Sequence, residues 1–296
     1  MCGICGVVSQ DAGQSLSETA GRMIRALRHR GPDGSGLWHD RTGAVALGHA
    51  RLAVIDPARG QQPMRSSDDR HVLVYNGEVY NFLSLRDELE RAGKRFRTHC
   101  DSEVLLESYN YWGEACLSRL RGMFAFAVYD TINHELFLAR DRTGIKPLYY
   151  ATLGGAFYFA SEMKAILAAG AWRLTLDYRS LVDFLSLSYT APPQTFFSEI
   201  REVEPGTWLR LTTQGIQRGT YWTWQRRPEE WNEPDSLEYS RRAILESLNE
   251  QLVADVPVGA FLSGGIDSSL LVAMLAEDLS RKVPNVHGGI RRSVVR

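Results

Sequence analysis

The sequence has few of the features that mark secreted, membrane-spanning or nucleic-acid-binding proteins. Only four of its 296 residues are cysteine, and they are too scattered for a disulfide framework in a chain of this length. No apolar run is long enough to span a bilayer, and no charged-then-apolar signal segment precedes Cys2. The formal net charge is −1, so neither nucleic acid nor an anionic membrane is indicated as a partner. We therefore expect a globular protein of the cytoplasm.

The length of 296 residues favours two domains. Tryptophan, arginine, glutamate and proline cluster between residues 222 and 234, and this shift in composition is typical of an interdomain linker. We assign a first domain to residues 1–224, a linker to residues 225–235 and a second domain to residues 236–296.

The first domain shows the periodicities of an α+β fold. Helices are expected over residues 16–29, from Phe82 to about Gly93, and from Asp101 onward. Glycine and proline crowd residues 30–36, which predicts a loop there. Because the strands and helices do not alternate regularly, we expect antiparallel sheets. The predicted strands are residues 3–9, 44–52, 71–75, 122–130, 135–140, 147–152 and 157–160.

Cys2 stands directly after the initiator methionine. If Met1 is removed, Cys2 carries a thiol and a free α-amine on one carbon. Such an amine titrates at about 7.7–8.0 and can activate a nucleophile as its base. The alternative interpretation is a small apolar residue at the start of a buried strand. Cys5 gives metal-ligand spacing with Cys2, but without a second pair we expect no zinc site.

A thiol that attacks an amide needs donors for the oxyanion and charged partners for the substrate. Arg51, at the end of a predicted strand, can hold a carboxylate bidentately. Asn76 and Gly77 can donate to an oxyanion, and Asp101 can accept from an ammonium. The alternatives are a surface ion pair for Arg51, a hairpin turn for the Asn-Gly pair and a helix cap for Asp101.

In the second domain, residues 263–269 lie between a predicted buried strand at 258–262 and a predicted apolar helix at 270–279. They are rich in glycine and serine, so the backbone can approach an anion at a helix N-terminus. No lysine is present, which excludes the Gly-x4-Gly-Lys loop. The pattern favours a phosphate site over a plain tight turn.

Seven stretches carry motifs of a known family: residues 1–6, 28–33, 49–52, 76–81, 100–103, 139–150 and 159–165. Taken in chain order, they resemble the class II glutamine amidotransferase domain and, more closely, the glutamine-hydrolysing asparagine synthetase family. Residues 263–269 resemble the pyrophosphate-binding loop of ATP pyrophosphatases, including the synthetase domain of that family. The resemblance implies a sandwich of two antiparallel sheets between helix layers, as in N-terminal nucleophile hydrolases, followed by the start of an α/β parallel-sheet domain.

The resemblance also implies roles in the first domain. With Met1 removed, the Cys2 thiolate attacks the side-chain amide of glutamine, ammonia leaves from a thioester, and water releases glutamate. The catalytic residues are then Cys2 with the oxyanion pair Asn76 and Gly77. The implied glutamine-binding residues are Arg51, Leu52, Val54, Ile55, Asn76, Gly77, Glu78 and Asp101.

In the second domain, the resemblance implies that the loop holds ATP with Mg²⁺, for which Asp267 is the metal ligand. Aspartate is adenylated at its β-carboxylate, and ammonia from the glutaminase site attacks it. The implied ATP-binding residues are Leu262, Ser263, Gly264, Gly265, Asp267, Ser268 and Ser269.

The synthetase domain of this family continues well past the loop, whereas this sequence ends soon after it. We therefore expect an incomplete ligase half, and residues from about 255 onward to be poorly ordered in isolation or to need a partner. A second copy or a complementing chain would serve. Two alternatives remain open: an amidotransferase for another carboxylate acceptor, and an inactive fragment that only binds ATP.

Overall fold

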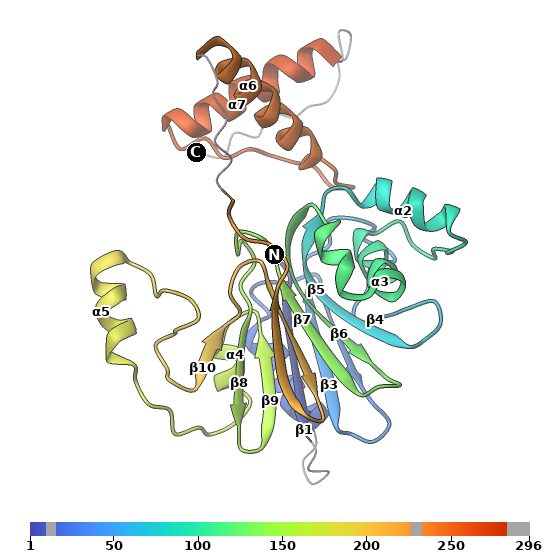
Figure 1. The fold of residues 1–296 in the computed structure, drawn as a ribbon, viewed down its shortest axis with the longest axis vertical. Coiled ribbons are helices and arrows are strands. Elements are labelled where there is room, and N and C mark those ends of the chain that lie inside the picture. Colours follow the sequence, from blue (N-terminus) through green and yellow to red (C-terminus); the bar gives the residue numbers. More distant parts are fainter. Residues whose placement is uncertain (10–15, 226–232, 283–296) are drawn as a thin grey trace. The chain divides into compact units, whose positions relative to one another are not determined.

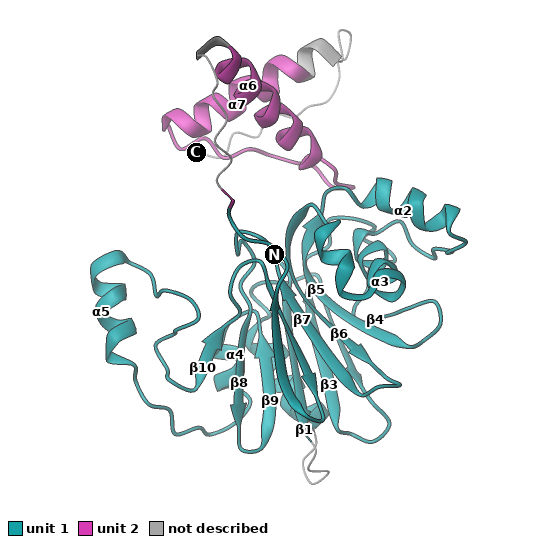
Figure 2. Ribbon diagram, in the orientation of Figure 1, with its two compact units in different colours: residues 1–224 teal, residues 225–296 magenta. Residues whose placement is uncertain are grey.

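The structure, a computed structural model, describes residues 1–9, 16–225 and 233–282. The chain divides into two compact units, Met1–Trp224 and Gln225–Arg296 (Figure 2). Most of the predicted linker, residues 226–232, and the predicted second domain from residue 283 onward lie outside the described residues. Within the described ranges, no helix has both the length and the apolar character needed to cross a membrane.

The first unit contains two six-stranded antiparallel sheets (Figure 1). The first sheet has the order β10-β8-β9-β1-β3-β2, so β1 is central, between β9 and β3. Its register pairs Gly3 with Ala50 and Cys5 with both Gly48 and Ala160. The strands of this sheet are β1 Gly3–Ser9, β2 Gly34–His39, β3 Val45–Arg51, β8 Tyr149–Leu153, β9 Ala156–Ala160 and β10 Ile200–Glu202.

The second sheet has the order β12-β11-β7-β6-β5-β4. Strand β5 pairs along its whole length with β6, but β4 pairs only with Leu73 and Val72 of β5. Beyond Leu73, that edge of β5 therefore has no neighbouring strand among the residues that the structure describes. The strands of this sheet are β4 Met64–Arg65, β5 His71–Val79, β6 Gly122–Asp130, β7 Glu135–Arg140, β11 Thr207–Thr212 and β12 Gly215–Thr220.

Helices cover the outer face of each sheet, which makes four layers. Helices α1 and α4 share a buried apolar cluster with the first sheet, and α2 and α3 share one with the second. A third cluster, with Ile4, Leu47 and Val74 among its members, joins strands of the two sheets. The helices of this unit are α1 Leu16–Ala26, α2 Phe82–Arg91, α3 Asp101–Trp112, the 3-10 helix η1 Gly113–Ser118, α4 Met163–Leu167 and α5 Tyr178–Leu187.

The sandwich follows from two-residue alternation along the strands. Val72 and Val74 of β5 pack in the cluster between the sheets, whereas Leu73 and Tyr75 pack under α2 and α3. Because successive strand side chains point to opposite faces, a strand that is buried on both faces is apolar throughout. The predicted α+β sandwich is confirmed for the first unit.

Several local predictions were wrong. The predicted loop at residues 30–36 ends early, because residues from Gly34 onward form β2 at the edge of the first sheet. Strand β5 runs to Val79 rather than ending at Tyr75. The strands β10, β11 and β12 carried no sequence prediction.

In the second unit, the structure describes helices α6 Glu233–Glu250 and α7 Ile266–Lys282. The strand predicted at residues 258–262 is wrong, since that segment has no regular structure. No strand occurs among the residues that the structure describes in this unit, so such a segment would have no neighbour for its backbone hydrogen bonds.

Candidate active site

Cys2 precedes β1, the central strand of the first sheet, by one residue. Its thiol accepts a hydrogen bond from the Leu52 backbone N–H, with an N···Sγ distance of 3.3 Å. The Cys2 carbonyl accepts from Arg30 Nε at 2.9 Å, and Arg30 is itself paired with Glu162 at 2.8 Å. These contacts hold the thiol in one place at the end of the strand.

A cavity of about 160 Å³ lies beside this thiol. A volume of this size suits a small ligand rather than a polymer. Its walls come from the two residues before β1, the end of β3 and the loop after it, the second half of β5, and the start of α3. All nine residues that were predicted for catalysis or glutamine binding line it, namely Cys2, Arg51, Leu52, Val54, Ile55, Asn76, Gly77, Glu78 and Asp101.

Asn76 and Gly77 lie inside β5, so the hairpin-turn interpretation is wrong. They pair with Ala125 and Phe124 of β6. Asn76 is 1% exposed, and its Nδ2 has no hydrogen-bond partner among the described residues. A Cβ at Gly77 would lie 2.3 Å from the Met123 carbonyl oxygen, so only glycine lets β5 approach β6 this closely.

Alternate backbone N–H groups of β5 point to the edge of the strand that borders this cavity. Tyr75 N donates to Gln62 Oε1 at 2.6 Å, and Val79 N donates to Asp101 Oδ2 at 3.0 Å. Because N–H groups alternate in direction along a strand, Gly77 N points to the same edge as these two. Among the described residues that edge has no neighbouring strand, so Gly77 N is available as a donor to a ligand, as is the unpartnered Asn76 Nδ2.

Asp101 is the first residue of α3, after the N-cap Cys100. Its carboxylate accepts from Tyr75 Oη at 2.8 Å and from Val79 N at 3.0 Å, so it is attached to β5 across the cavity wall. It is 6% exposed, and burial raises its pKa, while the bond from Val79 opposes that rise.

Arg51 ends β3 and points into the loop that follows. Its guanidinium donates to the carbonyl oxygens of Asp56 at 2.8 Å and Pro57 at 2.6 Å. Carbonyl oxygens carry no net charge, so these bonds orient the cation without neutralising it.

Sequence reasoning missed several cavity residues because no local pattern marks them. His49 is two residues before Arg51, and neither of its ring nitrogens has a hydrogen-bond partner in the part of the chain that the structure describes. Burial lowers its pKa to about 4, so the imidazole is neutral near pH 7. The residues missed are Met1, His49, Gly60, Gln62, Tyr75, Ser102, Met123 and Lys146.

The electrostatics of the cavity favour neutral groups around the sulfur. Burial raises the pKa of the Cys2 thiol, and the Leu52 N–H partly opposes the rise. Burial also lowers the pKa of Lys146 and raises that of Glu78, and these two charges oppose each other's shifts. The resting thiol is therefore protonated at neutral pH and needs a base in order to react.

The residues predicted to bind ATP lie in the second unit, at the start of α7. Ser263 Oγ and Ser268 Oγ are 3.0 Å apart, and Ser268 Oγ donates to the Gly265 carbonyl at 3.2 Å. Gly264 has φ +83, the left-handed region that favours glycine. The loop therefore closes on itself in front of the first free N–H groups of α7. The predicted residues here are Leu262, Ser263, Gly264, Gly265, Asp267, Ser268 and Ser269.

Two family models match the chain. The model described as a glutamine amidotransferase domain matches residues 1–222, and the model described as asparagine synthase matches residues 240–293. Each match falls almost entirely within one of the two compact units.

Curated relatives resemble nearly the whole chain. The glutamine-hydrolysing asparagine synthetase 1 of Bacillus subtilis (strain 168) is 40% identical over 284 residues, which cover 94% of this chain and 44% of that protein. A putative glutamine-hydrolysing asparagine synthetase of Mycobacterium tuberculosis (strain ATCC 25618 / H37Rv) is 41% identical over 297 residues, covering 93% and 45%. The chain thus spans less than half the length of these relatives.

Two solved structures share the fold. The glutamine phosphoribosylpyrophosphate amidotransferase of B. subtilis, complexed with ADP and GMP, aligns with a TM-score of 0.57 at 20% identity, covering 100% of this chain and 68% of that one. A structure titled as the allosteric regulatory enzyme of purine biosynthesis gives 0.58 at 21% identity, with the same coverage.

The paired antiparallel sheets, with a cysteine at the end of a central strand, define an N-terminal nucleophile hydrolase-like fold, as predicted. The chain belongs to the glutamine amidotransferase domain family, and its second unit carries the start of an asparagine synthase domain. The predicted family is confirmed.

Proposed function

We propose that the first unit is a glutaminase with Cys2 as its nucleophile. The observation that supports this most directly is the convergence of Cys2, Arg51, Asn76 and Asp101 on one small cavity. These residues lie far apart in the sequence, yet together they match one glutamine molecule. The Cys2 thiol suits attack on the amide carbon, and Asn76 suits the oxyanion that forms there. Arg51 suits the carboxylate and Asp101 the ammonium.

The terminal amine is the base in this proposal. Burial lowers the pKa of the chain's terminal α-amine, which sits next to Cys2, and so favours its unprotonated form. Removal of Met1 places such an amine on Cys2 itself. The amine takes the thiol proton as the sulfur bonds to the amide carbon, and the resulting ammonium then protonates the leaving nitrogen. Ammonia departs, and water hydrolyses the thioester to glutamate and regenerates the thiol.

Asn76 Nδ2 and Gly77 N stabilise the tetrahedral oxyanion. A buried donor without a partner costs about 1–3 kcal/mol, and a ligand oxygen that accepts from it removes this cost. Fixed donors in a water-poor site act most strongly where charge develops in the transition state. Arg51 binds the α-carboxylate and Asp101 the α-ammonium, with Glu78 and the loop residues Leu52, Val54 and Ile55 completing the wall.

We further propose that the ammonia serves ATP-dependent amidation of aspartate to asparagine. The family model for the second unit and the names of the curated relatives support this acceptor. Amidation of another carboxylate, and a fragment that binds ATP without glutaminase activity, are the competing outcomes.

The loop at the start of α7 suits ATP. Gly264 has open space where a side chain would stand, and the helix N-terminus offers free N–H groups to a phosphate. ATP supplies the adenylyl group that activates the acceptor carboxylate. Mg²⁺ in such sites is held by phosphate oxygens and one or two carboxylates, and Asp267 is the carboxylate at this position. Binding of MgATP, weakened by Asp267→Asn, would support the assignment.

We place the protein in the cytoplasm. All four of its cysteines are free, including three that are buried, as suits a reducing compartment.

Release of glutamate from glutamine tests the proposal. We expect steady release by the chain and none detectable from Cys2→Ala. Cys5→Ala is the matched control, because Cys5 is fully buried three residues away and faces the apolar cluster under α1. Glutamate release by Cys2→Ala, or none by the unmodified chain, would refute the proposed function.

A further inference from the structure

The loop after Arg51 contains a residue with an unusual backbone conformation. Asp56 has φ +43, in the left-handed region that non-glycine residues rarely occupy and that aspartate and asparagine tolerate best. Its carbonyl oxygen accepts from Gly60 N at 2.9 Å, which closes the turn. The loop conformation therefore depends on the residue at position 56.

This turn holds the Arg51 guanidinium. Nη2 donates to the Asp56 carbonyl at 2.8 Å and Nη1 to the Pro57 carbonyl at 2.6 Å. A Cβ at Gly60 would lie 2.8 Å from Arg51 Nη2, so the loop packs directly against the cation. The direction of the guanidinium is thus set by the backbone around Asp56.

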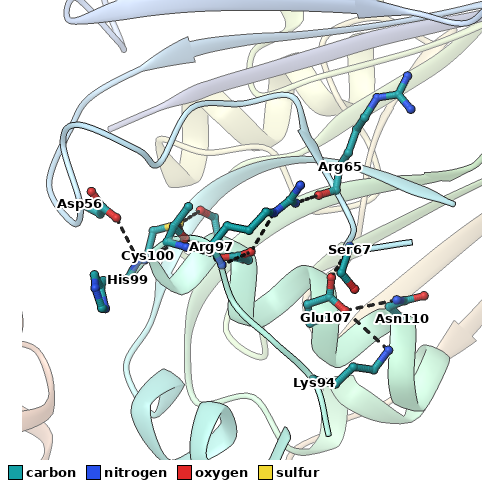
Figure 3. A network of polar contacts seen from close by, with 12 residues as sticks. Asp56, Arg65, Ser67, Lys94, Arg97, His99, Cys100, Glu107 and Asn110 are labelled. Carbon is teal, nitrogen blue, oxygen red and sulfur yellow. Dashed lines mark hydrogen bonds and ion pairs between the residues drawn. The ribbon is translucent and has the colours of Figure 1, made fainter. Parts of the chain in front are cut away.

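The Asp56 side chain reaches a different part of the molecule. Oδ1 accepts from Arg59 N at 3.1 Å within the loop. Oδ2 accepts from the backbone N of His99 at 2.9 Å, two residues before Asp101 (Figure 3). One carboxylate therefore joins the loop that holds Arg51 to the segment that leads into Asp101.

That segment is itself firmly held. Glu103, 1% exposed, accepts from Thr98 N at 2.7 Å and from Arg97 N at 3.0 Å. Asp101 is attached to β5 as well, so the segment that contains His99 is held on both sides. The hydrogen bond between Asp56 and His99 therefore fixes the position of the loop relative to that segment.

We propose that Asp56 is a positioning residue that sets the separation between Arg51 and Asp101 to the length of one amino-acid backbone, so that a single substrate engages both charges. This inference rests on the proposed glutaminase function. Asp56 lies beside the cavity walls but is not among the residues that line the cavity, so it acts through Arg51 rather than by touching substrate.

The test is the kinetics of glutamate release by two variants. Asp56→Ala removes both side-chain bonds and the residue type that tolerates φ +43, and we expect an about 10-fold higher KM for glutamine with kcat within about twofold. Asp56→Asn keeps the backbone preference and one acceptor oxygen, and we expect an about threefold higher KM. If the alanine variant does not fold, the asparagine variant decides.

The matched control is Asp69→Ala. Asp69 also has a positive φ, +58, but its carboxylate is exposed on the turn between β4 and β5. We expect no change in KM. A double variant with Arg51→Lys should raise KM no further than Arg51→Lys alone, because both changes disturb one interaction.

Unchanged KM in folded Asp56 variants, equal effects from Asp69→Ala, or additive effects with Arg51→Lys would each overturn the proposal. A second measurement tests the role of Asp56 separately from the proposed reaction. It compares, by calorimetry, the binding of L-glutamine to Cys2→Ala chains with and without Asp56→Asn. If the unmodified chain releases no glutamate although the Cys2→Ala chain binds glutamine, the reaction is refuted, and the binding comparison still decides the role of Asp56.

Discussion

The two candidate sites are built in opposite ways. The cavity of the first unit gathers buried groups from separate strands, a loop and a helix, and its polar side chains bond across elements, as Asp101 does to β5. In the loop of the second unit, the hydrogen bonds of the serines stay within residues 263–269. Ile266 within this loop and Phe261 before it are 86% and 85% exposed.

This difference separates two kinds of chemistry. Stabilising an oxyanion needs fixed donors in a water-poor site, which only long-range packing supplies. Binding a phosphate needs free backbone N–H groups, which one loop and one helix turn can supply. The first site should therefore respond strongly to single changes within its walls, and be indifferent to changes in the second unit's loop.

Among the cavity residues that support Cys2, Asn76→Ala should cause the largest loss. Removing one oxyanion donor lowers kcat by about 100- to 1,000-fold in comparable sites, and KM should change little. Asn81→Ala is the control, because Asn81 follows the same strand but its amide bonds to the backbone of Arg119 and Arg121. A loss below about tenfold for Asn76→Ala would remove the oxyanion role from this residue.

The buried His49 predicts a pH dependence of stability. Its pKa of about 4 lies below the ordinary value of 6.5, so the unfolded chain binds a proton first as the pH falls. The stability that the buried, neutral His49 contributes is therefore fully present above pH 6.5. It is lost as the pH falls toward 4, by about 3 kcal/mol. Urea unfolding at several pH values gives the slope of the unfolding free energy against pH. This slope should be shallower for His49→Gln and unchanged for His39→Gln, whose side chain is exposed on β2. Equal slopes for His49→Gln and the unmodified chain would contradict this.

Asp101→Asn should act mainly on substrate affinity. The amide loses the charge that attracts an ammonium, while its oxygen can still accept from Tyr75 Oη and Val79 N, which both donate to one oxygen of the carboxylate. We expect KM for glutamine to rise by about 10- to 100-fold. Asp87→Asn, on the exposed side of α2, is the control. A change in kcat alone would argue for a different role.

The smallest expected effect tests the independence of the sites. Ser263→Ala and Ser268→Ala remove the hydroxyl pair of the loop, so binding of a fluorescent ATP analogue should weaken while glutamate release stays within about twofold. A large loss of glutaminase activity would show that the first site depends on the second unit's loop.

Regular periodicity made most of the first unit predictable. The strands with buried alternation, such as β1, β6 and β7, and the amphipathic helices α1 and α2 follow from local sequence. Strand β2 was missed because its glycines are typical of loops, while its partner β3 supplies the pairing that makes it a strand. The strand predicted at residues 258–262 shows the reverse case, since an apolar run without a neighbouring strand stays irregular.

The candidate site was predictable only where its residues lie in short sequence motifs. Arg51, Asn76 and Asp101 stand at the ends of patterned segments, so their residue types suggested roles. His49, Tyr75 and Lys146 join the cavity through strand pairing and packing, which no window of sequence reveals. The same holds for Asp56, whose bond to His99 spans 43 residues.

The central claim is that a freed terminal thiol at Cys2 attacks glutamine in this cavity. The most direct measurement is mass spectrometry of the chain after reaction with a glutamine analogue that carries an electrophilic carbon in place of the amide. We predict one adduct per chain, on Cys2, in molecules that lack Met1, and protection by excess glutamine. An adduct on another residue, or labelling of Cys2 in chains that retain Met1, would contradict the account.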